Sequence, residues 1–336
     1  MNEGDVVEQD KSVLTSAFEQ PEENPAPRRR RSTLVRVLIG MVVAVVVIVA
    51  GTAGAGVYFA NKLDKNIERI GNVFGPLPRE GRPGKEPVAA DALNVLLVGS
   101  DVRAKGQTTG SAGTPTGGSE RSDTIMIVHI PADRKHAYVV SLPRDSWVPV
   151  PGRGITKINA AYAYGGPTLL VRTIEQLTDV QIDHYAQVDF AGFKSMTDAV
   201  GGVDIPAAGH LDGESALAYV RERKTLANGD FDRIKRQHRF LRALMSRAKP
   251  TDPVAFTKLM DAVTRSVSID DGMSGGDLRS LALGMRSVRA GDIHFHTAPT
   301  KGTGMVGDQS VVFLDPSADR LLWEAIRNDR MSTWKK

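Results

Sequence analysis

One uninterrupted apolar run constrains the architecture of this chain more than any other sequence feature. Residues 37–60 are 24 consecutive residues without a formal charge, and most of them are Val, Ile, Leu, Ala or Gly. At the rise of an α-helix, about 20 residues cross the hydrocarbon core of a bilayer. A helix buried in a soluble core is usually shorter and keeps one polar face. We therefore expect a transmembrane helix over residues 37–60.

The charges beside this run predict its orientation. Five arginines precede it, four at residues 28–31 and one at Arg36, whereas Lys62, Lys65 and Arg69 follow it. An excess of basic residues marks the cytoplasmic side, and a long C-terminal domain can be translocated regardless of its charge. We therefore expect a single-pass protein of the cell membrane, with a cytoplasmic N-terminus and an extracytoplasmic C-terminal domain.

A cleaved signal peptide is the alternative interpretation of the same region. A basic segment, an apolar run and the sequence Ala53-Gly54-Ala55 resemble the three parts of such a signal. The apolar stretch nevertheless continues to Ala60, which gives it the length of a full membrane span. The polar composition before the span predicts that residues 1–36 form a disordered cytoplasmic tail.

The composition also excludes several kinds of site. The chain has no cysteine, which excludes disulfides, thiolate metal sites and cysteine nucleophiles. Its net charge is only +4, and much of the local basicity lies beside the span, where topology or anionic lipid explains it. Nucleic acid is therefore not an expected partner.

The rest of the chain is expected to form a spacer and one α/β domain. Charged residues mixed with Gly and Pro predict a spacer at residues 61–90, before a domain at 91–329 and a tail at 330–336. Residues 106–118 are rich in Gly, Ser and Thr and predict a mobile surface loop. Apolar runs predict strands at 94–99, 124–130 and 137–142, and amphipathic stretches predict helices at 167–177, 212–220, 233–248 and 253–267. This mixture favours a sheet covered by helices on both faces.

Two aspartates stand at the predicted ends of neighbouring strands. Asp101 comes just after the first predicted strand, and Asp123 opens the second. Ligands of α/β folds bind in the crevice at strand ends, and two carboxylates there suit Mg²⁺, which completes its octahedron with water and phosphate oxygens. Taken singly, each aspartate is more commonly a turn or capping residue.

Arginines supply a second cluster of candidate site residues. Arg121, Arg144, Arg221, Arg223 and Arg233 follow or open predicted elements. Arg221 and Arg223 would share one side of an extended segment, and Arg233 would share a helical face with Gln237. Several guanidinium groups at one place match a pyrophosphate, which needs bidentate donors. Any one of these arginines alone is better explained as a surface ion pair.

Together these segments resemble the LytR-CpsA-Psr family. The resemblance covers about residues 94–244 and rests on NVLLVGSD, ERSDTIMIVHI, VSLPRDSWVPVPG, KINAAYAYGG, HLDGESALAYVRERKT and GDFDRIKRQ. The later KGTG and DQSVVFLD are also similar to the end of the family sequence. The usage of Ala, Val, Gly and Arg is typical of a GC-rich genome, as in actinobacteria.

The resemblance implies a fold and an enzymatic activity. The implied fold is a three-layer α/β/α structure with a central mixed sheet and an apolar pocket for a lipid chain. The implied enzyme is a Mg²⁺-dependent phosphotransferase that moves a glycopolymer from a polyprenyl pyrophosphate carrier to peptidoglycan, with possible pyrophosphatase activity. Asp101 and Asp123 fall on metal-associated positions. Pyrophosphate-binding or catalytic positions match Arg121, Arg144, Arg221, Arg223, Arg233 and Gln237, supported by Asp145 and Lys157.

Two features depart from the family pattern, and three other functions remain open. The loop between Asp101 and Arg121 is long and Gly-rich, and residues 201–210 are shorter than the usual connection, which affects the edge of the lipid pocket.

A pyrophosphate hydrolase would use the same residues with water as the nucleophile. A lipid-binding scaffold would not need both aspartates. A transcription regulator is disfavoured, because no helix-turn-helix with a basic face is recognisable.

Overall fold

The computed structural model describes residues 67–77, 81–100, 122–222, 226–247, 261–285 and 287–334. The expected tail, the expected transmembrane helix and the Gly-rich loop at 106–118 lie outside these residues. Within the described ranges, every helix is too short or too polar to cross a bilayer.

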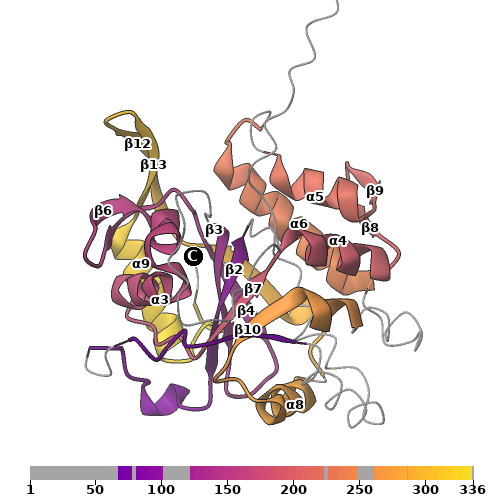
Figure 1. Ribbon diagram of the computed structural model, residues 1–336, viewed down its shortest axis with the longest axis horizontal. Helices are drawn as coiled ribbons and strands as arrows, with labels where there is room; N and C mark the ends of the chain where they lie inside the picture. The colour runs from indigo at the N-terminus through magenta and orange to yellow at the C-terminus, as the bar shows by residue number, and fades with distance from the viewer. Residues whose placement is uncertain are drawn as a thin grey trace, which may run out of the picture. The chain divides into compact units, whose positions relative to one another are not determined.

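A seven-stranded mixed sheet forms the centre of the described fold (Figure 1). Its strands follow the order β1-β10-β7-β2-β3-β4-β11. Three neighbouring pairs are parallel and the other three are antiparallel. The strands are β1 (Glu68–Ile70), β2 (Leu93–Ser100), β3 (Ser122–Ile130), β4 (Ala137–Leu142), β7 (His184–Val188), β10 (Val267–Asp270) and β11 (Ile293–Thr297). The three strands expected from apolar runs are thus confirmed as β2, β3 and β4.

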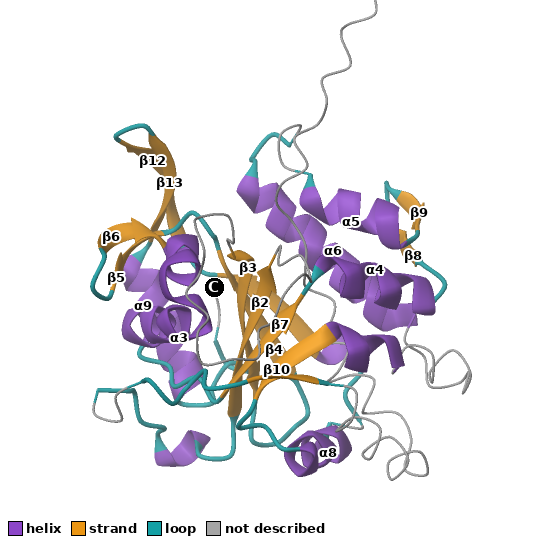
Figure 2. Ribbon diagram, viewed as in Figure 1, coloured by secondary structure: helices purple, strands orange, loops and turns teal. Residues whose placement is uncertain are grey.

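Alternate residues of the central strands feed two separate cores. On β2, Leu96 and Val98 pack against α3 (Ile158–Thr178) and α9 (Pro316–Arg327). Val95 and Leu97 belong to the other core. The helices of that second core are α4 (Phe190–Ala199), α5 (Gly213–Arg221), α6 (Asp230–Arg247) and α8 (Gly275–Gly284). Because strand side chains alternate between faces, helices cover both faces of the sheet, as expected (Figure 2).

Three two-stranded hairpins extend from this framework. They are β5–β6 (Trp147–Val150 and Gly154–Lys157), β8–β9 (Val203–Ile205 and Gly209–Leu211) and β12–β13 (Thr300–Val306 and Gln309–Leu314). Two 3₁₀ turns, η2 (Pro87–Ala89) and η3 (Ala290–Asp292), precede β2 and β11. The β13 strand is tied to the loop after β4, because the Val312 backbone N–H donates to the Asp145 carbonyl at 2.9 Å.

A kink divides α3 into two parts. Gly165 and Gly166 have non-helical backbone angles, and Gly166 has φ of 60°, which a residue without Cβ adopts most easily. Pro167 then opens the second part, where a fixed φ suits the first turn of a helix. The helix predicted over 167–177 is therefore this second part, and the structure adds a first part that begins at Ile158.

The helix predicted over 253–267 is wrong at its C-terminal end. Residues 261–266 are helical, but Val267 opens strand β10, which lies between β1 and β7. Val267 is 2% exposed, and its backbone pairs with that of Val188. Pairing partners on both sides of β10 override the helical periodicity of the local sequence.

Residues on both flanks of the expected domain add to its packing. The range assigned to a spacer, 61–90, includes β1 and the buried side chains of Ile67, Val73 and Leu77. In the range assigned to a tail, Trp334 lies edge-on to His296 with ring centroids 5.1 Å apart. The described parts of these flanks are therefore packed segments.

Candidate active site

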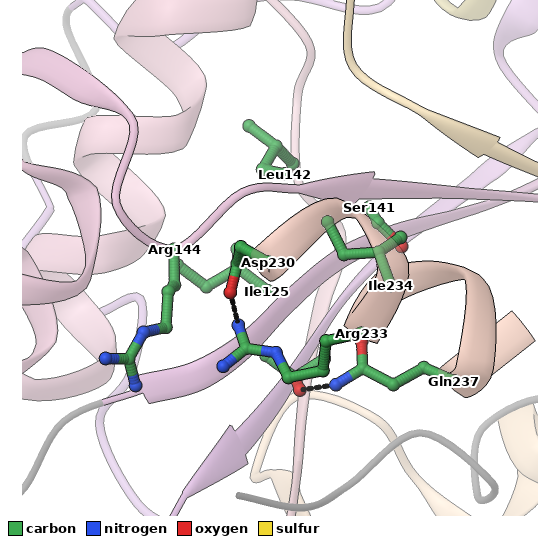
Figure 3. A pocket seen from close by; sticks show the side chains of 9 residues that line it. Ile125, Ser141, Leu142, Arg144, Asp230, Arg233, Ile234 and Gln237 are labelled. Atoms are coloured by element: carbon green, nitrogen blue, oxygen red, sulfur yellow. Dashed lines mark hydrogen bonds and ion pairs between the residues drawn. The ribbon is translucent and has the colours of Figure 1, made fainter. Parts of the chain in front are cut away.

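A small pocket lies where the beginning of β3, the end of β4 and the first turns of α6 meet (Figure 3). Its lining combines apolar and charged side chains from these three segments. The lining residues are Thr124, Ile125, Ser141, Leu142, Arg144, Asp230, Arg233, Ile234 and Gln237. Three residues predicted from the sequence, Arg144, Arg233 and Gln237, therefore meet at one place, although 89 residues separate Arg144 from Arg233 (233 − 144).

The loop after β4 fixes the position of Arg144. Ser146 donates its backbone N–H to the Pro143 carbonyl at 3.0 Å and its hydroxyl to the same oxygen at 2.7 Å. The Arg144 carbonyl accepts the Asn159 N–H at 3.1 Å, which ties the loop to the start of α3. Because both sides of Arg144 are held, its buried side chain starts from a rigid backbone.

Asp145 lies between two cationic groups. One carboxylate oxygen is 3.7 Å from Arg144 Nε, and the other is 3.5 Å from Lys157 Nζ. Lys157 is the residue that precedes α3. Arg144, Asp145 and Lys157 are therefore neighbours in space. Asp145 links the pocket arginine to the junction between β6 and α3.

Helix α6 presents Arg233 and Gln237 on one buried face. Their side chains are 2% and 3% exposed, as the spacing of four residues predicts for one face. Arg233 forms an ion pair with Asp230 one turn earlier, and the Gln237 amide donates to Thr124 Oγ1 at 3.3 Å (Figure 3). The helix starts at Asp230, one turn before the expected residue 233. Asp230 was missed, although its i, i+3 spacing from Arg233 is visible in the sequence.

Arg221 occupies a different conformation from the one expected. It is the last residue of α5, whose first turn is capped by the Asp212 carboxylate, and the chain becomes extended only at Glu222. The expectation of an extended segment is therefore wrong for Arg221. Its guanidinium lies 4.8 Å from the centroid of the Phe190 ring, and it is not among the residues that line the pocket. Arg223 lies outside the described residues.

The two candidate metal ligands can be placed only in part. Asp101 and Arg121 lie outside the described residues, and Asp123 is within β3 but its side chain is not described. In the backbone ladder, Gly99 pairs with Thr124 and Ser100 with Ser122, so Asp123 is the extra residue of a bulge. Within the described residues, no three His, Asp or Glu side chains form a group that could hold a metal. The metal role of Asp101 and Asp123 stays a prediction.

A histidine–serine pair beside the pocket was not predicted. Ser141 Oγ and His238 Nε2 share a hydrogen bond of 2.9 Å, and both side chains are buried. Burial, followed by the charges of Arg242 and His296, lowers the pKa of His238 to about 3. The imidazole is therefore neutral at physiological pH. In the sequence, only its position next to Gln237 marks His238 as a residue near the site. That position does not reveal its partner on β4.

The pocket has the chemistry of an anion site. Two guanidinium groups line it together with amide and hydroxyl groups, and Asp230 lies beside one of the guanidiniums. Guanidinium forks donate two parallel hydrogen bonds to phosphate oxygens, whereas lysine acts as a point charge. The arrangement therefore suits a phosphate or diphosphate group.

Comparisons with known proteins identify relatives of this chain and agree with its fold. The chain is 33% identical to the cell wall biosynthesis protein LcpA of Corynebacterium glutamicum, over 87% of this chain and 66% of the relative. It is 33% identical to TagU of Bacillus cereus, a polyisoprenyl-teichoic acid–peptidoglycan teichoic acid transferase, over 58% of this chain and 66% of that protein. The chain thus spans just under two thirds of the length of these relatives.

A solved structure and a family model cover the same region. The crystal structure of Bacillus subtilis TagV matches 73% of this chain and 99% of its own chain, with a TM-score of 0.56 and 27% identity. The LytR_cpsA_psr family model matches residues 78–209 and 206–326, which include Arg144, Arg233 and every strand of the central sheet except β1. The chain therefore belongs to the LytR_cpsA_psr family.

Proposed function

We propose that this chain transfers a glycopolymer from a polyprenyl pyrophosphate carrier to peptidoglycan during cell wall assembly. The observation that carries the proposal is the meeting of Arg144, Arg233 and Gln237 in one pocket of a LytR_cpsA_psr fold. The activity of TagU, transfer of teichoic acid from a polyisoprenyl carrier to peptidoglycan, supports the reaction class.

The proposed reaction exchanges one phosphorus–oxygen bond for another. A hydroxyl oxygen of the acceptor attacks the phosphorus bonded to the glycan, and the bond from that phosphorus to the bridging oxygen breaks. Polyprenyl monophosphate leaves, and the glycan is joined to peptidoglycan through a phosphodiester. Arg144 and Arg233 bind the phosphate oxygens and stabilise the charge that develops on them. Asp145, held between Arg144 and Lys157, or alternatively Asp123, is the proposed acceptor of the hydroxyl proton.

Mg²⁺ is the proposed cofactor, held by Asp101 and Asp123. The backbone pairing of Ser100 with Ser122 supports this assignment, because each serine is the sequence neighbour of one of these aspartates. When bound, the ion would neutralise phosphate charge. Arg121, Arg221 and Arg223 are proposed as further cationic residues of the site. Asp123→Ala should weaken the dependence of turnover on Mg²⁺, and an unchanged Mg²⁺ titration would remove Asp123 from the metal site.

The membrane position is also a proposal. Residues 37–60 would form an uncleaved span, with the domain extracytoplasmic and an apolar pocket for the carrier chain between sheet and helices. The length of the apolar run and the preceding arginines support it. N-terminal sequencing of the protein extracted from membranes tests the span, and a mature chain that begins at Gly56 would refute it.

The activity is tested with the full-length chain in detergent, a polyprenyl pyrophosphate-linked glycan and peptidoglycan fragments. Transfer gives polyprenyl monophosphate together with glycan bound covalently to peptidoglycan. Monophosphate and free glycan phosphate would indicate a hydrolase, and binding without either product would indicate a scaffold. Arg144→Ala should abolish most turnover, whereas Arg239→Ala, an exposed arginine on α6, is the matched control.

A further inference from the structure

Two hydrogen bonds between side chains fasten α6 to the sheet beside the pocket. Gln237 donates to Thr124 on β3 at 3.3 Å, and His238 shares the 2.9 Å bond with Ser141 on β4. The four side chains are all buried. Consecutive residues of one helix therefore contact two neighbouring strands.

The bond between His238 and Ser141 joins the two segments that carry the pocket arginines. Ser141 stands three residues before Arg144, and His238 stands five residues after Arg233. Both arginines line the pocket. Like charges that are buried repel each other more strongly than charges in water, because the surrounding dielectric is lower. A bond between β4 and α6 opposes the separation of these two charges.

The chemistry of His238 excludes a role in proton transfer. An effective general base has a pKa near the working pH. Burial and the cation of Arg242 keep the pKa of His238 at about 3, so the imidazole is a weak base that remains neutral. It therefore cannot activate Ser141 as a nucleophile at neutral pH. A neutral imidazole can still donate or accept one hydrogen bond in a fixed geometry.

We propose that the Ser141–His238 hydrogen bond sets the separation of Arg144 and Arg233 and makes the pocket selective for a diphosphate over a monophosphate. This inference rests on the proposed function and assigns His238 as a positioning residue. A diphosphate engages both arginines at once, so its affinity depends on their separation. Orthophosphate needs only one guanidinium, so its affinity does not.

The test compares the affinities of two probes, inorganic pyrophosphate and orthophosphate, by calorimetry on the full-length chain in detergent with MgCl₂. Ser141→Ala and His238→Leu should lower the pyrophosphate affinity about 10-fold, the equivalent of one hydrogen bond, and change the orthophosphate affinity less than about twofold. His238→Gln should restore selectivity, because an amide nitrogen can replace Nε2. The matched control is Thr197→Val, which removes a buried hydroxyl that donates to the Phe193 carbonyl within α4, away from the pocket residues.

Each outcome supports or overturns a named claim. If wild type binds neither probe, both the proposed function and this inference fail. If wild type binds pyrophosphate and Arg233→Ala does not, while Ser141→Ala behaves like Thr197→Val, only the positioning role fails. Equal losses for both probes would also overturn it, because they indicate general damage to the site. Should Ser141→Ala not fold, His238→Leu and His238→Gln give the same comparison at one position.

Discussion

The two ends of β3 both carry buried polar side chains, but the groups that contact these side chains differ. At the C-terminal end, His129 is 0% exposed, and its ring contacts Asn94 Oδ1 at 2.8 Å and Asp329 Oδ1 at 3.0 Å. Asp329 also accepts the Ala132 N–H. At the N-terminal end, Thr124 contacts Gln237 in a pocket that two arginines also line.

The difference teaches how to separate a structural polar cluster from a ligand site. In the His129 cluster, imidazole, amide and carboxylate alternate, so the protein itself supplies each partner. In the pocket, two guanidinium groups are accompanied by one carboxylate, Asp230, so the charged groups of the lining are positive in balance and favour an anion. Burial is common to both ends of β3. The sign of the charges and the presence of a pocket distinguish them.

The largest expected effect comes from removing a pocket arginine. Arg233→Ala should lower turnover by roughly two to three orders of magnitude, because it removes a preorganised charge from the proposed phosphate site. It should also cost about 3 kcal/mol of stability, because the Asp230 carboxylate loses its partner. Turnover per folded molecule and urea unfolding measure the two effects.

The control for this variant is Arg82→Ala. Arg82 pairs with buried Glu175 at 2.6 Å and donates to the Ile182 carbonyl, away from the pocket residues. It should lose stability as Arg233→Ala does, but keep its turnover per folded molecule. Equal losses of turnover in both variants would break the distinction between the two kinds of cluster.

A buried carboxyl that belongs to neither cluster gives the next effect. Asp319 on α9 is 6% exposed, and its Oδ1 has no hydrogen-bond partner in the described part of the chain. Burial, then the charge of Asp315, raises the pKa of Asp319 from 3.8 to about 7. The folded state therefore holds this proton more tightly than the unfolded state. Stability contributed by the protonated carboxyl is present below pH 4 and is lost as pH rises to about 7.

Asp319→Asn should remove this loss. The variant should gain roughly 2 to 4 kcal/mol at pH 8, and little below pH 4. Urea unfolding across this pH range is the measurement. A wild-type curve that rises between pH 4 and 7 in parallel with that of the variant would contradict the assignment to Asp319.

A smaller loss is expected at the C-terminal end of β3. His129→Leu should cost about 1 to 3 kcal/mol, because Asn94 and Asp329 each lose a buried partner. Turnover per folded molecule should stay within about twofold of wild type, because a change of that size corresponds to less than one hydrogen bond. A change in pyrophosphate affinity that exceeds this limit would connect the two ends of β3 and weaken the comparison.

The smallest effect is expected on the β8–β9 hairpin. His210 and Arg247 contact Asp204 and lower the pKa of its carboxyl through hydrogen bonds. All three side chains are exposed, so solvent and salt screen their interaction. Asp204→Asn should leave the melting temperature unchanged within error at low and high salt. A clear salt-dependent decrease would show that surface charge clusters also support this fold.

The framework of the fold was predictable where the signal is local. Strands β2, β3 and β4 follow continuous apolar runs, and α6 follows a helical spacing that also places Arg233 and Gln237 together. Strands β1 and β10 were not predictable, because Glu68 pairs with Ser268 across 200 residues (268 − 68). Val267 lies in a locally helical pattern, and only its distant partners identify it as a strand residue.

Two of the five predicted arginines lie together in the candidate pocket, and their partners were not predicted. The motifs predicted that Arg144 and Arg233 belong together, and their side chains line one pocket. The sequence does not reveal that Ser141 contacts His238, because a hydroxyl on a strand can face any of several helices. For Arg221, the expected conformation depended on where α5 ends, and that boundary differs by one residue.

The early position of β1 limits how far the sheet can stand from a membrane. If the proposed span ends at Ala60, eight peptide steps reach Glu68, where β1 pairs with β10. Fully extended, those steps cover at most about 28 Å. A free spacer of 30 residues would cover about 100 Å. The proposed span would therefore hold the sheet edge close to the lipid head groups. The domain would then reach only those acceptor strands of the wall that lie next to the bilayer.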